Sequence, residues 1–330
     1  MRQFATHLTG KGNDSRPCCE AMRSRVFFPG RLVLLLIHGA LTVLVLSWWL
    51  LAGSPSSPES QDRQDFSSPP IRRLVSLAPS MTEILYFLEL GHEVVGVTAY
   101  CNYPPEVKTK PRVGTYWEFN LEAILALKPD LVLAMAHQGE GKGPTAVLSH
   151  WHLPVYIGRA DSLPELFQLI EDLARVTGRE EVARRKLPPL RERARRVEER
   201  VRDLPHPRVL LEIDQEPLIT VGGASIQGDL IQRAGGINIA GALPQRYPVI
   251  NLEEVLKAQP EVILFTGMAS SEVLPRRAVF WRRWGMLPAV RQGRLWWVEP
   301  ELVDRPGPRL VDGLERLAEF FHGPPPVVLK

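Results

Sequence analysis

From residue 71 onward, short apolar runs typical of strands alternate with longer amphipathic segments typical of helices. Strands that are buried on both faces read as nearly continuous apolar runs. By this criterion the chain has strands at 73–78, 93–98, 131–134, 154–158, 208–213 and 218–221. Because strands joined through helical crossovers pair in parallel, the pattern predicts an α/β fold with mostly parallel sheets.

Several of the predicted helices begin at a residue whose side chain can accept a hydrogen bond from a free backbone N–H group. These residues are Asn120, Ser162, Ser225 and Asn251. A fifth helix start, at Ser80, is followed three residues later by Glu83. That spacing predicts a capping box, in which the hydroxyl and the carboxylate each satisfy one backbone N–H group.

The two halves of this region repeat each other. Residues 120–133 and 251–264 both begin with Asn-Leu-Glu and both end in an apolar run, at a constant offset of 131 positions. Internal similarity of this kind predicts two lobes of similar construction. We expect an N-terminal α/β lobe at 71–176 and a C-terminal α/β lobe at 207–330.

Residues 177–206 connect the two predicted lobes. Between 179 and 204, Glu and Arg alternate with sparse apolar positions, which is typical of a long solvated helix. Pro188 and Pro189 fall inside it, and proline removes a helical hydrogen bond and clashes with the preceding turn. We therefore expect this connecting helix to be kinked or made of two pieces.

An apolar segment at 32–52 follows three arginines and precedes the predicted lobes. Its 21 residues are long enough to cross a bilayer, and the positive flank predicts that residues 1–31 stay in the cytoplasm. A cleaved signal peptide and a retained transmembrane anchor are equally consistent with this pattern, and both predict a periplasmic or extracytoplasmic protein. Residues 53–70 are rich in Ser and Pro and predict a flexible linker.

Charge excludes one class of partner. The formal net charge is +3, and residues 1–52 hold six basic and two acidic residues, so the remainder is close to neutral. Binding to nucleic acid requires clustered Lys and Arg, and we expect no such partner. The three cysteines offer no disulfide within the predicted lobes and no metal or redox motif.

Four segments resemble the helical-backbone (class III) substrate-binding proteins of ABC importers, and most of all their cobalamin-binding branch. The segments are residues 73–83, 103–105, 114–132 and 305–309. The resemblance implies two Rossmann-like lobes joined by a single long backbone helix, with the ligand in the cleft between them. It also implies that the chain captures cobalamin or a related corrinoid as a transported ligand, without a cofactor, and delivers it to an ABC permease dimer. A haem, ferric-siderophore or other metal-chelate ligand is the alternative.

The same resemblance implies a set of ligand-binding residues in the cleft. They are Tyr103, Tyr116, Trp117, Met135, Tyr247, Glu301 and Arg305. Aromatic rings suit a corrin macrocycle because they cover apolar area at low entropic cost. Each assignment has a plainer alternative, since the aromatic residues can serve only packing and Arg305 can serve only to pair with Glu301.

Glu122 and Glu253 occupy equivalent positions in the two repeated segments. The resemblance implies that each lies on the rim of one lobe and engages the permease dimer, and two equivalent charges suit a two-fold symmetric partner. The alternative is that each carboxylate only stabilises the first turn of a helix.

Neither a metal site nor an enzyme is indicated by the motifs. The eight histidines do not form a set with the ligand number and spacing of a zinc site, and we expect no metal. The chain has no nucleophile elbow, dinucleotide-binding motif or phosphate-binding loop. We therefore expect no catalytic residues, with a two-lobed glycosyltransferase-like enzyme as the alternative from another class.

Overall fold

The computed structural model describes residues 71–116, 118–136, 148, 151–267 and 273–324. The first half forms a parallel sheet with strand order β2-β1-β3-β4. Its strands are β1 (Leu74–Ser76), β2 (Val94–Val97), β3 (Leu131–Met135) and β4 (Val155–Gly158). Helix α2 (Pro79–Phe87), the short 3₁₀ helix η1 (Pro105–Thr109) and helix α3 (Leu121–Ala126) connect them. We call this half the N-terminal lobe.

The second half, here the C-terminal lobe, forms a sheet with strand order β6-β5-β8-β9, beside which β7 pairs with β5. Its strands are β5 (Arg208–Gln215), β6 (Leu218–Thr220), β7 (Ile237–Asn238), β8 (Val262–Phe265) and β9 (Leu295–Trp297). Only β6 runs antiparallel among these described strands. The helices are α7 (Ile226–Arg233), α8 (Leu252–Ala258), α9 (Val273–Arg282), α10 (Pro288–Arg291), α11 (Pro300–Val303) and α12 (Leu310–His322).

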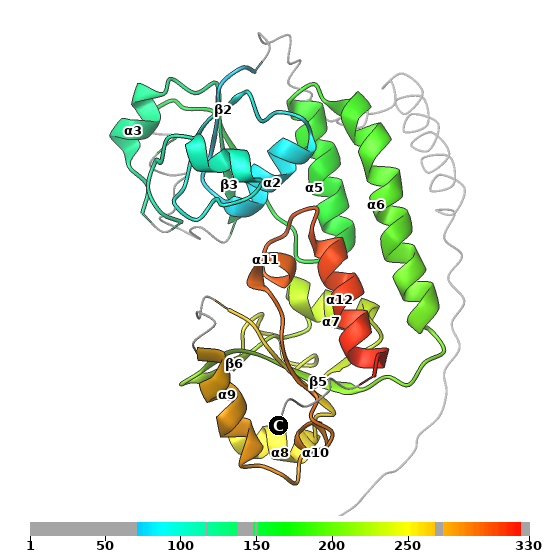
Figure 1. Ribbon diagram of the computed structural model, residues 1–330. Coiled ribbons are helices and arrows are strands. Elements are labelled where there is room, and N and C mark those ends of the chain that lie inside the picture. The colour runs from blue at the N-terminus through cyan, green and yellow to red at the C-terminus, as the bar shows by residue number, and fades with distance from the viewer. Residues whose placement is uncertain (1–70, 117, 137–147, 149–150, 268–272, 325–330) are drawn as a thin grey trace, which may run out of the picture. The chain divides into compact units, whose positions relative to one another are not determined.

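Two helices, α5 (Leu163–Val176) and α6 (Glu180–Val201), lie between the sheets in sequence and pack against each other (Figure 1). The first part of α6 is bound to the N-terminal lobe, where Arg179 pairs with Glu93 at 2.6 Å. Its second part is bound to the C-terminal lobe, where Arg193 pairs with Asp312 of α12 at 2.6 Å. The long helix is therefore attached to both lobes.

The expectation of a connector made of two pieces is wrong, because one helix runs through both prolines from Glu180 to Val201. Both prolines are exposed. Apolar side chains recur on the buried side of the helix before and after them, at Ala183, Leu187, Leu190, Ala194, Val197 and Val201. This continuous stripe packs into the core, and its burial offsets the hydrogen bonds that the prolines remove.

Four of the five predicted helix caps are confirmed. Asn120, Ser162, Ser225 and Asn251 each accept a hydrogen bond from a backbone N–H group in the first turn. The capping box at Ser80 is wrong: α2 begins at Pro79, and its N-cap residue, Ala78, makes no side-chain cap. Glu83 has a different partner, described below.

A single apolar cluster joins both lobes and the long helix. It contains Leu74 and Leu133 of the first sheet, Leu187 and Val197 of α6, and Val209 and Leu314 of the C-terminal lobe. Because all of these side chains are buried, displacement of one lobe from α6 exposes apolar area to water. This shared core fixes where the two lobes meet.

In the part of the chain that the structure describes, no helix combines the length and hydropathy required to span a bilayer. The apolar segment at 32–52 lies outside that part.

Candidate functional site

A cavity of about 220 Å³ lies where the two lobes meet. The N-terminal lobe contributes Met135, the last residue of β3, together with residues that follow β1 and β2. The C-terminal lobe contributes Ile226, the first residue of α7, and loop residues before and after α11. The complete lining is Pro79, Ser80, Tyr100, Tyr116, Met135, Ile226, Tyr247, Pro300, Asp304, Arg305 and Pro306. Ligands of parallel α/β sheets bind beyond the carboxyl ends of the strands, which is where this cavity lies.

Four of the predicted ligand-binding residues line this one cavity: Tyr116, Met135, Tyr247 and Arg305. Tyr103 and Glu301 are not among its lining residues. Trp117 lies outside the described residues. The fold thus brings together residues that are up to 189 positions apart, from Tyr116 to Arg305.

Tyr116 and Tyr247 come from different lobes and face the same space. Burial raises the pKa of Tyr116 to about 12, and the neighbouring Tyr247 contributes to the increase. Burial also raises the pKa of Tyr247. Both phenols therefore stay neutral at physiological pH, and the cavity presents two uncharged aromatic side chains to a ligand.

Seven lining residues were not predicted as ligand-binding, and two of them carry an aromatic ring or a carboxylate. Tyr100 follows β2 and is 40% exposed. Asp304 follows α11, and its carboxylate accepts hydrogen bonds from Gln227 Nε2 and Thr266 Oγ1, both at 3.0 Å. Burial raises the pKa of Asp304 while these two bonds oppose the increase. Its position next to Arg305 is a signal that was available in the sequence.

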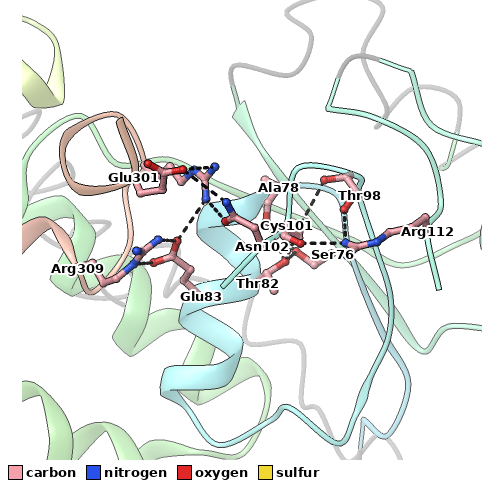
Figure 2. Close-up of polar contacts among 11 residues, drawn as sticks. Ser76, Ala78, Thr82, Glu83, Thr98, Cys101, Asn102, Arg112, Glu301 and Arg309 are labelled. Atoms are coloured by element: carbon pink, nitrogen blue, oxygen red, sulfur yellow. Dashed lines mark hydrogen bonds and ion pairs between the residues drawn. The ribbon is translucent and has the colours of Figure 1, made fainter. Parts of the chain in front are cut away.

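Beside the cavity, the loop after β2 meets the segment after α11. Arg305 Nη1 donates to Asn102 Oδ1 at 2.6 Å, and Asn102 Nδ2 lies 3.5 Å from Glu301 Oε1 (Figure 2). Arg305 Nη2 is also 3.5 Å from Glu301 Oε1, so the predicted pairing of these two residues is a weak one. Asn102 therefore bridges the two lobes at the edge of the cavity.

A partly buried polar network within the N-terminal lobe holds the loop that carries Asn102 (Figure 2). Arg112 Nη1 donates to the carbonyl oxygens of Thr98 and Cys101, at 2.8 and 2.9 Å. Thr82 Oγ1 of α2 lies 3.1 Å from Cys101 Sγ. Because these groups are satisfied within the N-terminal lobe, the loop has a defined position at the cavity.

Glu83 makes a second connection between the lobes. Its carboxylate accepts two hydrogen bonds from Arg309, from Nε at 2.9 Å and from Nη2 at 2.6 Å (Figure 2). The guanidinium of Arg309 also lies 4.0 Å from the ring centroid of Tyr103. Tyr103 lines a separate cavity of about 640 Å³ together with Glu83 and Arg309, and this space is not the one that holds Tyr116 and Tyr247.

Glu122 and Glu253 lie in the first turns of α3 and α8, at equivalent places in the two lobes, and both are exposed. Asn120 caps α3, and Asn251 with Glu254 forms the capping box of α8. Within the described residues, neither Glu122 nor Glu253 has a hydrogen-bond or ion-pair partner for its carboxylate.

Metal binding was also considered for the described residues. They contain no group of three or more His, Cys, Asp and Glu side chains arranged to hold a metal ion. His137, the histidine closest to the cavity in sequence, lies outside this part of the chain.

Comparison with known proteins gives a consistent result. The model of a family described as periplasmic binding protein matches residues 74–301. The chain is 30% identical over 253 residues to the vitamin B12-binding protein of Vibrio cholerae, which covers 76% of this chain and 90% of the relative. It is also 30% identical over 259 residues to an uncharacterized ABC transporter substrate-binding lipoprotein of Bacillus subtilis, covering 76% of this chain and 80% of the relative.

Two solved structures extend the comparison to the fold. The crystal structure of the periplasmic vitamin B12 binding protein of Vibrio cholerae has a TM-score of 0.68 and 29% identity, covering 76% of this chain and 97% of that one. The apo form of the periplasmic heme-binding protein of Roseiflexus sp. RS-1 has a TM-score of 0.68 and 28% identity, covering 76% and 98%. The predicted fold class, two Rossmann-like lobes joined by one long helix, is thereby confirmed.

Proposed function

The chain belongs to the periplasmic binding protein family, and from this premise we propose that it is the extracytoplasmic ligand-binding component of an ABC importer. Its ligand is cobalamin or a related corrinoid, bound at the cavity between the lobes. Residues 71–176 and 207–330 act as the two halves of the binding cleft, and 177–206 connects them. The chain captures and delivers this ligand without catalysing a reaction.

One observation carries this proposal: two tyrosines from opposite lobes, Tyr116 and Tyr247, line a single cavity. Aromatic side chains cover large apolar faces at low entropic cost, which suits a corrin ring held from both sides. Arg305 and Asp304 supply the few polar groups that fix a ligand's orientation in an otherwise apolar pocket. The relatives named as vitamin B12-binding proteins support the same ligand class.

The size of the cavity sets a condition on binding. Pockets for drug-sized ligands occupy about 300–1,000 Å³, and a corrinoid lies at or above the top of this range. At about 220 Å³, the cavity holds only an edge of such a ligand. We infer that the lobes separate at the cavity when a corrinoid binds, which breaks the contacts of Asn102 with Arg305 and Glu301.

Titration of the purified full chain with cyanocobalamin tests the ligand. We expect saturable quenching of tryptophan fluorescence, and we expect Tyr116→Ala with Tyr247→Ala to weaken binding at least tenfold because both ring faces are lost. Trp151→Ala is the matched control, since this exposed aromatic residue is not part of the cavity lining. If haem or a ferric siderophore binds more tightly than cyanocobalamin, the ligand is another metal chelate and not a corrinoid. Binding or turnover of a nucleotide sugar would favour the alternative function, a two-lobed glycosyltransferase-like enzyme.

Glu122 and Glu253 are proposed to dock the loaded protein on a two-fold symmetric permease dimer. Their exposure, their equivalent positions and the absence of partners within the described residues support this role. Charges at the rim of an interface mainly guide the two proteins together and fix their relative orientation, and they add less to the affinity of the complex.

The docking proposal is tested by Glu122→Ala with Glu253→Ala. Uptake driven by the permease is expected to fall strongly, whereas ligand affinity stays within twofold of the parent. Glu106→Ala with Glu180→Ala is the matched control, because both residues are exposed glutamates in the first turn of a helix. Equal loss of uptake in both variants, or a large loss of ligand affinity in the first, would contradict the proposal.

A further inference from the structure

Helix α9 and the turn after it carry an exposed surface that the proposed function does not use. Three arginines on it, Arg276, Arg282 and Arg283, are exposed. Two apolar side chains accompany them, Val279 at 49% exposure and Met286 at 59%. We call these five residues the α9 surface.

Helix geometry places most of these residues on one side. Successive residues of an α-helix are rotated by about 100°, so Arg276, Val279 and Arg283 fall within one third of the circumference, and Arg282 borders them. The opposite side holds Arg277 and Trp281, at 4% and 0% exposure. Arg277 donates to the carbonyl oxygens of Thr266 and Ile213, both at 2.9 Å, and so attaches the helix to the sheet.

Within the described residues, no acidic side chain pairs with the arginines of the α9 surface. Among the described residues, the guanidinium groups of Arg276, Arg282 and Arg283 take part in no hydrogen bond or ion pair. The sequence from Val273 to Val298 contains six arginines and no acidic residue. Elsewhere in the fold, arginines on exposed helices are commonly paired, as Arg195 is with Glu192 and Glu199.

We propose that the α9 surface binds the anionic headgroups of a phospholipid bilayer. Unpaired arginines among exposed apolar side chains suit the boundary between headgroups and acyl chains, where the guanidinium groups meet phosphate and the apolar groups leave water. The sequence also supplies proximity. The apolar segment at 32–52 is long enough to span a bilayer, and the 18-residue linker at 53–70 gives a root-mean-square reach of about 25 Å.

This inference rests on the proposed extracytoplasmic location and is independent of the ligand. Contact with the bilayer would limit how the domain can orient and would keep it at the membrane, where a permease lies. Each arginine near an anionic surface strengthens association about fivefold, so three together contribute about 100-fold at low ionic strength.

Fluorescence quenching on vesicles tests the proposal. The full chain carries Met286→Cys with an environment-sensitive fluorophore, Cys18 and Cys19 are replaced by Ser, and Cys101 is left in place because it is 1% exposed. The vesicles are phosphatidylcholine with or without about a third of phosphatidylglycerol, and they contain nitroxide-labelled lipid. We expect quenching to depend on phosphatidylglycerol and to decrease as salt is added.

The decisive variant is Arg276→Gln with Arg282→Gln and Arg283→Gln. It is expected to reduce the ratio of membrane-bound to free domain about 100-fold. Arg196→Gln with Arg200→Gln and Arg202→Gln removes the same charge from the exposed part of α6 and is the matched control. An equal loss in both variants would attribute the effect to net charge and overturn the proposal.

Two other results would overturn it as well. Quenching that is the same with and without phosphatidylglycerol would mean that the α9 surface does not recognise anionic lipid. Absence of lipid quenching together with a loss of permease-driven uptake in the α9 variant would identify an acidic protein surface as the partner. Ligand titration of the same variant separates these outcomes from failure of the proposed function, because its affinity for the ligand is expected to be unchanged.

Discussion

Two buried glutamates, Glu83 and Glu212, each lie near an arginine, yet their geometries differ. Glu83 is 4% exposed and receives two hydrogen bonds from Arg309, at 2.6 and 2.9 Å. Glu212 of β5 is 0% exposed and receives one hydrogen bond, from Trp281 Nε1 at 2.5 Å. Its Oε1 lies 3.5 Å from Arg277 Nε, and within the described residues neither of these two atoms has a hydrogen-bond partner.

The difference is one of alignment rather than of residue type. A bidentate guanidinium compensates the desolvation of a carboxylate, whereas an arginine turned toward backbone carbonyls does so only in part. Burial accordingly raises the pKa of Glu212 to about 7, with Trp281 and Arg277 opposing the increase. Glu83 therefore connects the lobes through two aligned hydrogen bonds from Arg309, and Glu212 is a group that gains or loses a proton near neutral pH.

The largest effect is expected from breaking the aligned pair. Arg309→Met leaves Glu83 buried without its bidentate partner, which costs about 3–5 kcal/mol in the free energy of unfolding. Arg305 Nη1, 3.9 Å from Glu83 Oε1, places the expected loss near the lower end of that range. Urea denaturation of the full chain measures it at neutral pH.

The control for this experiment replaces both partners. Glu83→Gln with Arg309→Met removes the buried charge as well, so most of the lost stability is expected to return. If Arg309→Met alone proves as stable as the parent, the bidentate pair does not hold the lobes together, and the contrast with Glu212 disappears.

The second effect concerns pH and the titration of Glu212. Its pKa is about 7 in the folded chain, above the ordinary value of 4.5 for a glutamate, so the folded state binds the proton more tightly than the unfolded state. Its contribution to stability is therefore present below pH 4.5 and is lost as the pH rises through 7. The full loss is about 3 kcal/mol.

Glu212→Gln tests this dependence because it keeps the shape of the side chain and removes its titration. Denaturation between pH 5 and pH 8 is expected to show a flatter stability profile for this variant than for the parent. Glu118→Gln, a change at an exposed glutamate, is expected to leave the profile as it is. A parent profile without any decrease over this range would contradict the raised pKa of Glu212.

Local signals in the sequence predicted much of this fold. Asn120, Ser162, Ser225 and Asn251 cap helices as expected, because a capping bond joins residues only three positions apart. The buried strands were found for a similar reason, since continuous apolar runs report burial on both faces.

Long-range contacts could not be predicted in the same way. The expected capping role of Glu83 failed because its partner, Arg309, lies 226 positions away and binds it more strongly than a backbone N–H group does. Pro188 and Pro189 do not divide the connector into two pieces for a related reason, since packing of α6 against both lobes outweighs local propensity. In the site, four residues predicted from the resemblance line one cavity: Tyr116, Met135, Tyr247 and Arg305. Tyr100 depends on the geometry of the loop after β2, which no short-range pattern encodes, whereas Asp304 could have been found from its position next to Arg305.

The smallest effect on stability is expected where the lobes meet at the exposed edge of the cavity. Asn102 bridges Arg305 and Glu301 there, and exposed polar contacts of this kind contribute less than about 1 kcal/mol. Asn102→Ala should therefore leave urea denaturation nearly unchanged, in contrast to Arg309→Met.

The effect of Asn102→Ala on the rate of ligand association is expected to be larger than its effect on stability, because the cavity must widen before a corrinoid enters. Removal of a contact worth about 1 kcal/mol raises the population of the open form about fivefold, and the association rate in stopped-flow mixing with cyanocobalamin should rise in proportion. Asn102→Asp, which keeps the acceptor for Arg305, should increase it less. Equal rates in the parent and Asn102→Ala would mean that the contact at Asn102 does not limit opening, leaving Glu83 with Arg309 as the pair that does.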